Sequence, residues 1–301
     1  MNQQRTMWLT QALFVTFLWS ASKIIMKLGL GVVSPFVLIG SIQTVSFLAV
    51  LIYYLIRRPK VRWDFKPSEI KALVLAGLIG YAAAPLFAVI GLKYVTGTTA
   101  GLFAGLSSML VMIFGAIILK ERPRSQQLLG VSLAVVGVYV FLGGGGASGS
   151  LFGMLMLLIS EASYALNTVM TRFVVRKPGD ETLSTSLITN AIGAAVLLPA
   201  GLLSGGSVAV LGQWQIGLAV LVVGAIFGFA GMMWSAALDK LQALEAAILQ
   251  NTMLIQVAVL SIVFLGEQLT LHNVLGGIGV LIGAYLVDHQ IKSFKVRLSA
   301  I

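Results

Sequence analysis

Two stretches, LKERPRSQQLLG at residues 119–130 and LGEQLTLHNVLG at residues 265–276, share one pattern but differ in charge. Both begin with Leu, carry Glu two residues later and end in a Leu-Gly pair. The first stretch holds three cations, Lys120, Arg122 and Arg124, whereas the second holds no Lys or Arg. Because Lys and Arg concentrate in cytoplasmic loops, this difference predicts that the two turns lie on opposite sides of a membrane.

The composition also indicates a membrane protein. Of the 301 residues, 58% are hydrophobic and only 10% are charged, and the mean hydropathy is +0.98. A helix needs about 20 apolar residues to cross a bilayer, and it satisfies its backbone hydrogen bonds internally. We therefore expect an all-α membrane protein with ten transmembrane helices. The apolar runs fall at 8–30, 35–56, 70–92, 98–119, 126–143, 151–171, 183–203, 214–237, 244–265 and 272–289.

The formal charge of +10 would suggest a nucleic-acid partner in a soluble protein, but here it predicts basic cytoplasmic loops and no nucleic-acid partner. We place the N-terminus in the cytoplasm and alternate the ten spans. All of the 20 Lys and Arg residues except Lys23, Lys27 and Lys93 then fall on the inner side. This asymmetry predicts that both termini are cytoplasmic. The first apolar run lacks a small-residue cleavage pattern, so we expect it to be a retained span.

The two halves of the sequence align with one another. A shift of 146 residues matches Glu121 with Glu267 and Gly137 with Gly283 without a gap, and a shift of 147 brings Gln43 onto Asn190. We expect a first five-helix repeat at 1–146 and a second at 147–301. Five is an odd number, so the second repeat is inverted. Secondary transporters commonly use this plan and bind their solute near the midplane between the repeats.

Several elements resemble the EamA family of the drug/metabolite transporter superfamily. They are GLKYVTGTTAG (91–101), LKERPRSQQLLG, LEAAILQ (244–250), LGEQLTLHNVLGG (265–277) and the Trp19-Ser20 pair. The resemblance covers nearly the whole chain. It implies a ten-helix carrier of small organic solutes in the bacterial cytoplasmic (inner) membrane, and many family members export amino acids and metabolites. The usual Trp-Gly pair is Trp-Ser here, which puts any role of that glycine in doubt.

Glu161 is the main candidate for solute recognition and for coupling to an ion or proton. It lies in the middle of the run 151–171, where a carboxylate costs roughly 3 kcal/mol on insertion scales. Lys23 lies about 6 Å from Trp19 along the first span, at 1.5 Å per residue. We expect Lys23 and Glu161 to border one central cavity and to bind opposite ends of a zwitterion. The alternatives are a structural ion pair for Glu161 and, for Lys23, snorkelling to the headgroups.

Other intramembrane residues complete the expected cavity and its gate. Aromatic side chains can hold a cationic nitrogen or stack on an apolar solute, and buried amides can bind it. A proline inside a span kinks the helix, and glycines near it suggest a moving element. The expected solute-binding residues are Trp19, Ser20, Lys23, Tyr81, Glu161, Tyr164, Asn167, Trp234 and Asn251, and the expected hinge residues are Pro85, Gly80 and Gly231. For the aromatic and hinge residues the alternative is packing alone, and for the buried amides it is bonding to neighbouring helices.

Glycines spaced by four residues, such as Gly97, Gly101 and Gly105, predict close helix packing within the chain, with dimerisation as the alternative. We expect a monomer or a homodimer whose other partners are a small-molecule solute and membrane lipid. The turn residues Glu121 and Glu267 are expected to cap helices or to bond loops.

No feature of the sequence supports catalysis. Cysteine is absent, and neither a metal-ligand spacing nor a nucleotide loop is present, so we expect no cofactor, no metal and no enzyme activity. The sequence favours a secondary exporter of small solutes such as amino acids or amine metabolites. One alternative is a carrier of quaternary ammonium or aromatic cations. Another is a membrane scaffold or lipid-handling protein that transports nothing.

Overall fold

The structure is a computed structural model, and it describes residues 3–57, 63–118, 125–143, 149–174, 180–238, 241 and 243–289. The described residues are almost entirely helical, as predicted. The helices are α1 (Gln3–Gly29), α2 (Pro35–Arg57), α3 (Pro67–Ala76), the π-helix η1 (Gly77–Ala83), α4 (Ala84–Tyr94), α5 (Gly97–Ala104), α6 (Ser107–Ile118), α7 (Ser125–Gly143), α8 (Leu151–Val174), α9 (Asp180–Leu203), the 3-10 helix η2 (Val208–Gly212), α10 (Trp214–Leu238), α11 (Ala243–Leu265) and α12 (Leu271–His289). The turn that carries Glu121 lies outside the described residues, as do Lys120, Arg122 and Arg124.

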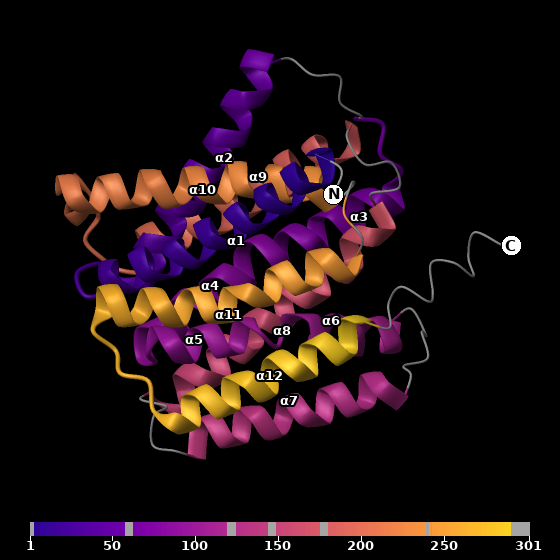
Figure 1. Cartoon of the computed structure of the whole chain (residues 1–301). Helices are drawn as coiled ribbons and strands as arrows, with labels where there is room; N and C mark the ends of the chain where they lie inside the picture. The colour runs from indigo at the N-terminus through magenta and orange to yellow at the C-terminus, as the bar shows by residue number, and fades with distance from the viewer. Residues whose placement is uncertain are drawn as a thin grey trace, which may run out of the picture.

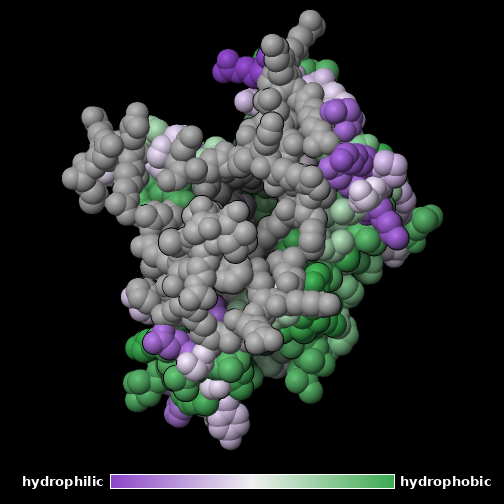
Figure 2. Space-filling model, turned by 90° about the vertical axis from the view of Figure 1, so that its right-hand side faces the viewer, coloured by the Kyte–Doolittle hydropathy of each residue, from purple (hydrophilic) through white to green (hydrophobic). Residues whose placement is uncertain are grey.

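Eight helical stretches within the described residues are long and apolar enough to cross a membrane. Two shorter apolar stretches, Leu249–Leu265 and Leu271–Leu286, lie in α11 and α12. Large apolar side chains are exposed on the outside of these helices, among them Leu129, Tyr139 and Ile282. In Figure 2 hydrophobic residues cover the lower right of this face, and hydrophilic residues lie at its upper right and at its lower left. An apolar exterior of this kind is what a helix bundle presents to lipid.

The helices form one bundle in which helices from the first half of the chain pack against helices from the second half (Figure 1). Helices α7 and α12 pair along one edge, and α2 packs between α9 and α10 at the opposite edge. Between these edges, α1 packs on α10 and α11, while α8 packs on α4 and α6. The start of α1 and the end of α12 lie at the same end of the bundle.

Glycine allows the backbones to approach closely, as the four-residue spacing predicted. A Cβ on Gly97 would lie 2.3 Å from Ser261 Oγ, and a Cβ on Gly101 would lie 3.0 Å from Val257, so this face of α5 packs on α11. Gly137 of α7 meets the backbone of Gly276 on α12 in the same way. Small residues at helix interfaces gain van der Waals contact where no hydrophobic effect drives association.

The predicted kink before Pro85 takes the form of a π-helix. Element η1 separates α3 from α4 and ends directly before Ala84 and Pro85. Pro85 has no backbone N–H to give to the preceding turn, which favours a local change in the hydrogen-bond pattern. A Cβ on Gly80 would lie 2.3 Å from Asn167 Cγ, and one on Gly193 would lie 2.5 Å from the Tyr81 carbonyl oxygen. The irregular segment is therefore held tightly between α8 and α9.

Candidate functional site

A pair of opposite charges joins the two halves inside the bundle. Lys23 Nζ of α1 lies 3.6 Å from Glu161 Oε1 of α8, and the two side chains are 22% and 9% exposed. Glu161 is the eleventh residue of the 24-residue helix α8, so its carboxylate lies near the middle of an apolar helix. An isolated charge at that depth is unfavourable, and an opposite charge within 4 Å compensates for it. The structure thus brings together the two charged residues that the sequence analysis singled out.

Two of the four predicted aromatic residues lie against each other beside the pair. The rings of Trp19 on α1 and Trp234 on α10 have centroids 5.4 Å apart and planes inclined by 55°. Trp19 lies one helical turn from Lys23. Tilted aromatic pairs are favourable and leave ring faces available for further stacking.

The other two aromatic residues lie on the side of Glu161. Tyr164 is three residues after Glu161 on α8, and Tyr81 is among the groups in its surroundings. Tyr81 belongs to η1, and its side chain hydrogen-bonds Thr189 of α9. Thr189 was missed by the sequence analysis, and its only signal was its position next to Asn190. Phenolic groups beside the ion pair can donate or accept hydrogen bonds and so extend the polar region.

The π-helix η1 and the residue after it pack against α8 on both sides of Glu161 along the helix. Asn167 of α8 packs directly on Gly80, so the amide contacts the π-helix rather than open space. Ser160, next to Glu161, donates a hydrogen bond of 2.8 Å to the Ala84 carbonyl oxygen at the end of η1. The position of the Glu161 backbone is thereby tied to the segment that contains Pro85.

Ser20 lies in a packed contact and does not face open space. Its side chain is fully buried, and its hydroxyl donates to the Thr16 carbonyl oxygen at 2.8 Å and to Gln256 Oε1 at 2.9 Å. Gln256 in turn donates to Thr16 Oγ1 and Thr252 Oγ1. These bonds join α1 to α11. Asn251, another predicted solute-binding residue, is also buried on α11.

Gly231 differs from Gly80 in its surroundings. Helix α10 continues through Gly231 without a break, and a Cβ at this position would meet no atom of the described residues within 4 Å. Gly231 therefore lacks the close contact with a described side chain that Gly80 makes with Asn167, and it lies three residues before Trp234.

A buried amide pair links helices α2 and α9. Gln43 Nε2 donates to Asn190 Oδ1 at 3.0 Å, and Ser46 Oγ donates to the same oxygen at 2.8 Å. Gln43 and Asn190 are the two residues that the shift of 147 aligned. The structure therefore brings these two aligned positions into direct contact.

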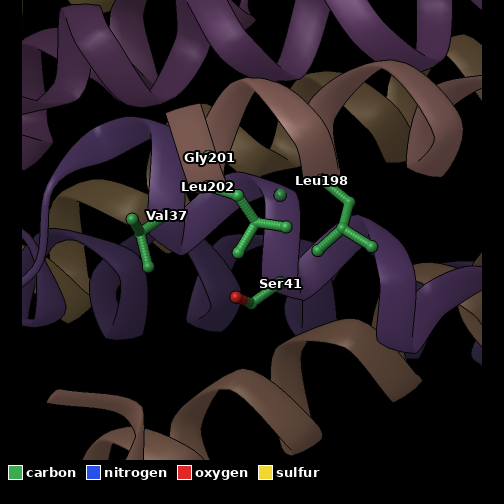
Figure 3. A pocket seen from close by; sticks show the side chains of 6 residues that line it. Val37, Ser41, Leu198, Gly201 and Leu202 are labelled. Carbon is green, nitrogen blue, oxygen red and sulfur yellow. The ribbon is translucent and has the colours of Figure 1, made fainter. Parts of the chain in front are cut away.

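A shallow pocket opens between the same two helices at the outside of the bundle (Figure 3). It is lined by Val37, Gly40, Ser41, Leu198, Gly201 and Leu202. Ser41 supplies the single side-chain polar atom of this lining, so the pocket offers no charge to a polar solute. It is separate from Lys23 and Glu161. Within the described residues, no group of three or more His, Asp or Glu side chains is arranged to hold a metal ion.

Comparison with known proteins identifies the family. The profile of the EamA-like transporter family matches residues 6–143 and matches again at residues 151–287. The chain belongs to the EamA-like transporter family. The structure therefore describes a multi-pass membrane protein of a transporter family, as the sequence resemblance implied, rather than a protein of an enzyme family.

Two relatives are similar to this chain over nearly their whole length. The chain is 26% identical to an uncharacterized transporter of Archaeoglobus fulgidus over 93% of this chain and 98% of that protein. It is 24% identical to a protein of Salmonella typhimurium named as a probable amino-acid metabolite efflux pump, over 96% of each chain. A solved structure titled only as a crystal structure of a protein superposes with a TM-score of 0.61 at 20% identity and covers 93% of this chain. That structural likeness supports the fold alone.

Proposed function

We propose that this EamA protein is a secondary transporter that exports small organic solutes carrying both an amine and a carboxylate, such as amino acids or their metabolites. The observation that carries the proposal is the contact of Lys23 with Glu161 at 3.6 Å inside the bundle. When a zwitterion binds, Lys23 can pair with its carboxylate and Glu161 with its amine in place of their contact with each other. No unpaired charge is then left in the membrane. The printed name of the Salmonella relative agrees with this solute class.

The membrane arrangement belongs to the same proposal. The chain forms ten transmembrane helices as two inverted five-helix repeats, 1–146 and 147–301, with both termini on the cytoplasmic side of a bacterial inner membrane. The double match of one family profile supports the repeat. The packing supports the repeat too. In the proposed repeat, α1 corresponds to α8, α4 to α10, and α6 to α11. The contact of α4 with α8 then has its counterpart in the contact of α10 with α1, and the contact of α6 with α8 has its counterpart in that of α11 with α1.

Alternating access follows from this arrangement. The two repeats rock about the interface around α2 and α9, and the site opens to one side of the membrane at a time. Glu161 is the residue proposed to couple transport to an ion or proton, since it is a buried acid at the site. Gly80 within η1 and Pro85 just after it form the proposed hinge of the first repeat. Gly231 is the proposed counterpart of this hinge in the second repeat.

A second candidate function is transport of quaternary ammonium or aromatic cations. The observation in its favour is the Trp19–Trp234 ring pair at 5.4 Å, close to an acid. Aromatic faces attract cations by about 0.5–2 kcal/mol each. In this reading Glu161 is the counter-ion of the solute, and Lys23 leaves the site when the cation enters.

Counterflow in proteoliposomes separates these functions. Vesicles preloaded with an unlabelled solute are mixed with a trace of the labelled solute, and a panel of amino acids, amines and choline-like cations is compared. Exchange of amino acids without exchange of fixed cations is the expected result, and the reverse supports the cation carrier. Movement of labelled lipid without exchange of any solute contradicts both and leaves a lipid-handling role.

A further inference from the structure

The turn between α4 and α5 is held by a cation on its α4 side. Lys27 Nζ, in the last turn of α1, donates to the Leu92 carbonyl oxygen at 2.6 Å and also to the Val95 carbonyl oxygen. These carbonyls belong to the C-terminal end of α4, where helix carbonyls lack intrahelical partners and carry partial negative charge. An ammonium group is the complementary partner for such an end.

A carboxylate holds the same turn on its α5 side. Glu267, in the connection between α11 and α12, accepts hydrogen bonds from the Gly97 backbone N–H at 2.6 Å and the Thr98 backbone N–H at 2.9 Å. It also accepts one from Thr98 Oγ1 at 2.6 Å. The free N–H groups at a helix N-terminus favour an anion, and three bonds to one carboxylate bind it firmly. The expectation that Glu267 caps a helix is thereby confirmed.

The two holding groups carry opposite charges, and Glu267 acts electrostatically on Lys27 across the turn. A third contact reaches the turn from the segment before α8, where the Ser150 N–H donates to the Tyr94 carbonyl oxygen at 3.0 Å. The turn is therefore bonded to α1, to the connection between α11 and α12, and to the segment before α8. These contacts lie at the end of the bundle remote from the start of α1 (Figure 1).

We propose that Lys27, Glu267 and residues 92–98 form a latch that keeps this end of the bundle closed, and that the latch must release before the solute site opens there. The proposal rests on the alternating-access function proposed above. Opening this end requires α1, α4–α5 and the α11–α12 connection to separate, and these are the elements that the two charged side chains join. With the termini in the cytoplasm, the latched end is the outer one.

The absence of cysteine makes a direct test possible, because any introduced thiol is the only one in the chain. Ser261 is a suitable reporter position, since it is fully buried on α11 beneath Gly97 and the Ser261→Cys change is nearly isosteric. The reporter protein is placed in lipid nanodiscs, and its rate of reaction with a membrane-impermeant methanethiosulfonate reagent is measured. The same rate is measured with Lys27→Met, Glu267→Gln and Glu267→Asp added separately.

The matched control is Glu69→Gln. Glu69 is a buried glutamate at the start of α3 whose carboxylate accepts from the Lys66 backbone N–H at 2.9 Å, so it has the same capping chemistry away from the latch. We expect Lys27→Met and Glu267→Gln each to raise the labelling rate by about tenfold or more, since a hydrogen bond to a charged group is worth at least that factor. Glu267→Asp, which keeps the charge, should give a smaller increase, and Glu69→Gln should give none.

Equal rates in the parent and both latch variants would overturn the proposal, and so would an equal increase with Glu69→Gln, which would indicate general loosening. A second reporter, Thr99→Cys, is also fully buried in α5 and checks that the result does not depend on Ser261. The labelling assay needs no solute. Faster labelling of the latch variants in a protein that exchanges no solute would refute the proposed transport and leave the latch standing.

Discussion

Replacing Glu161 by Gln should destabilise the fold and stop transport, and removing Lys23 as well should restore only the stability. The two charges are 3.6 Å apart. With an effective dielectric constant of about 20, Coulomb's law gives an attraction of roughly 5 kcal/mol at that separation. Lys23 keeps 22% of its side chain exposed, which weakens the interaction. We therefore expect Glu161→Gln to lower the free energy of unfolding by about 3 kcal/mol, near the lower bound measured for breaking buried ion pairs.

The double variant Lys23→Met/Glu161→Gln separates the structural role of the pair from recognition. It leaves no unpaired charge, so its free energy of unfolding should lie within about 1 kcal/mol of the parent. Its counterflow of amino acids should nevertheless be abolished, because neither end of a zwitterion then finds an opposite charge. A structural ion pair with no part in transport predicts instead that the stable double variant exchanges solute normally.

Thermal unfolding in detergent and counterflow in proteoliposomes measure the two effects on the same preparations. Lys93→Met is the control for removing a cation, because Lys93 lies in the last turn of α4 with an exposed side chain. It should change stability by less than about 0.5 kcal/mol. If Glu161→Gln protein were as stable as the parent and exchanged amino acids at the parental rate, the reasoning from the ion pair would be wrong.

Four further substitutions test the packing that supports the site. Gly80→Ala places a methyl group 2.3 Å from Asn167 Cγ and should lower the free energy of unfolding by about 1–3 kcal/mol. In Gly231→Ala the added methyl group meets no described atom within 4 Å, so this variant should change the free energy of unfolding by less than about 0.5 kcal/mol. Unfolding midpoints of the two variants check this, and equal midpoints would contradict it. Asn190→Leu removes an oxygen that accepts hydrogen bonds from two side chains, and it should lower the free energy of unfolding by about 1–2 kcal/mol. Gln43→Leu removes only one of the two donors to that oxygen, so it should lower the free energy of unfolding by less. The same unfolding assay decides the order, and a larger loss for Gln43→Leu would refute this account of the network.

Much of the helix pattern was predictable from the sequence, because apolar runs in lipid must satisfy their own backbone hydrogen bonds. The expected run 70–92 corresponds to α3, η1 and α4, and Pro85 correctly indicated an irregularity there. The π-helical form of that irregularity was not predictable. It depends on Gly80 packing against Asn167 and on Gly193 packing against the Tyr81 backbone, and these contacts come from helices far along the chain.

The candidate site shows the same division. Glu161 stood out because an acid in the middle of an apolar run is unfavourable unless it has a partner. Ser20 is predicted to bind the solute from its place on the helix face that also carries Lys23, and in this structure its buried hydroxyl is bonded to Gln256. A serine or threonine inside a helix can bond a neighbouring helix or line a cavity, and residue type and spacing alone do not separate these two environments.

The sequence by itself therefore determined that the chain is helical and apolar, where its helices run and which charges lie inside them. These properties follow from local composition and from the requirement for internal hydrogen bonds in lipid. Only the tertiary structure decided that Lys23 meets Glu161, that Trp19 meets Trp234, and that Lys27 and Glu267 hold one turn from its two sides. Each of these contacts joins residues far apart in the chain, and their distances depend on how the helices pack across the bundle.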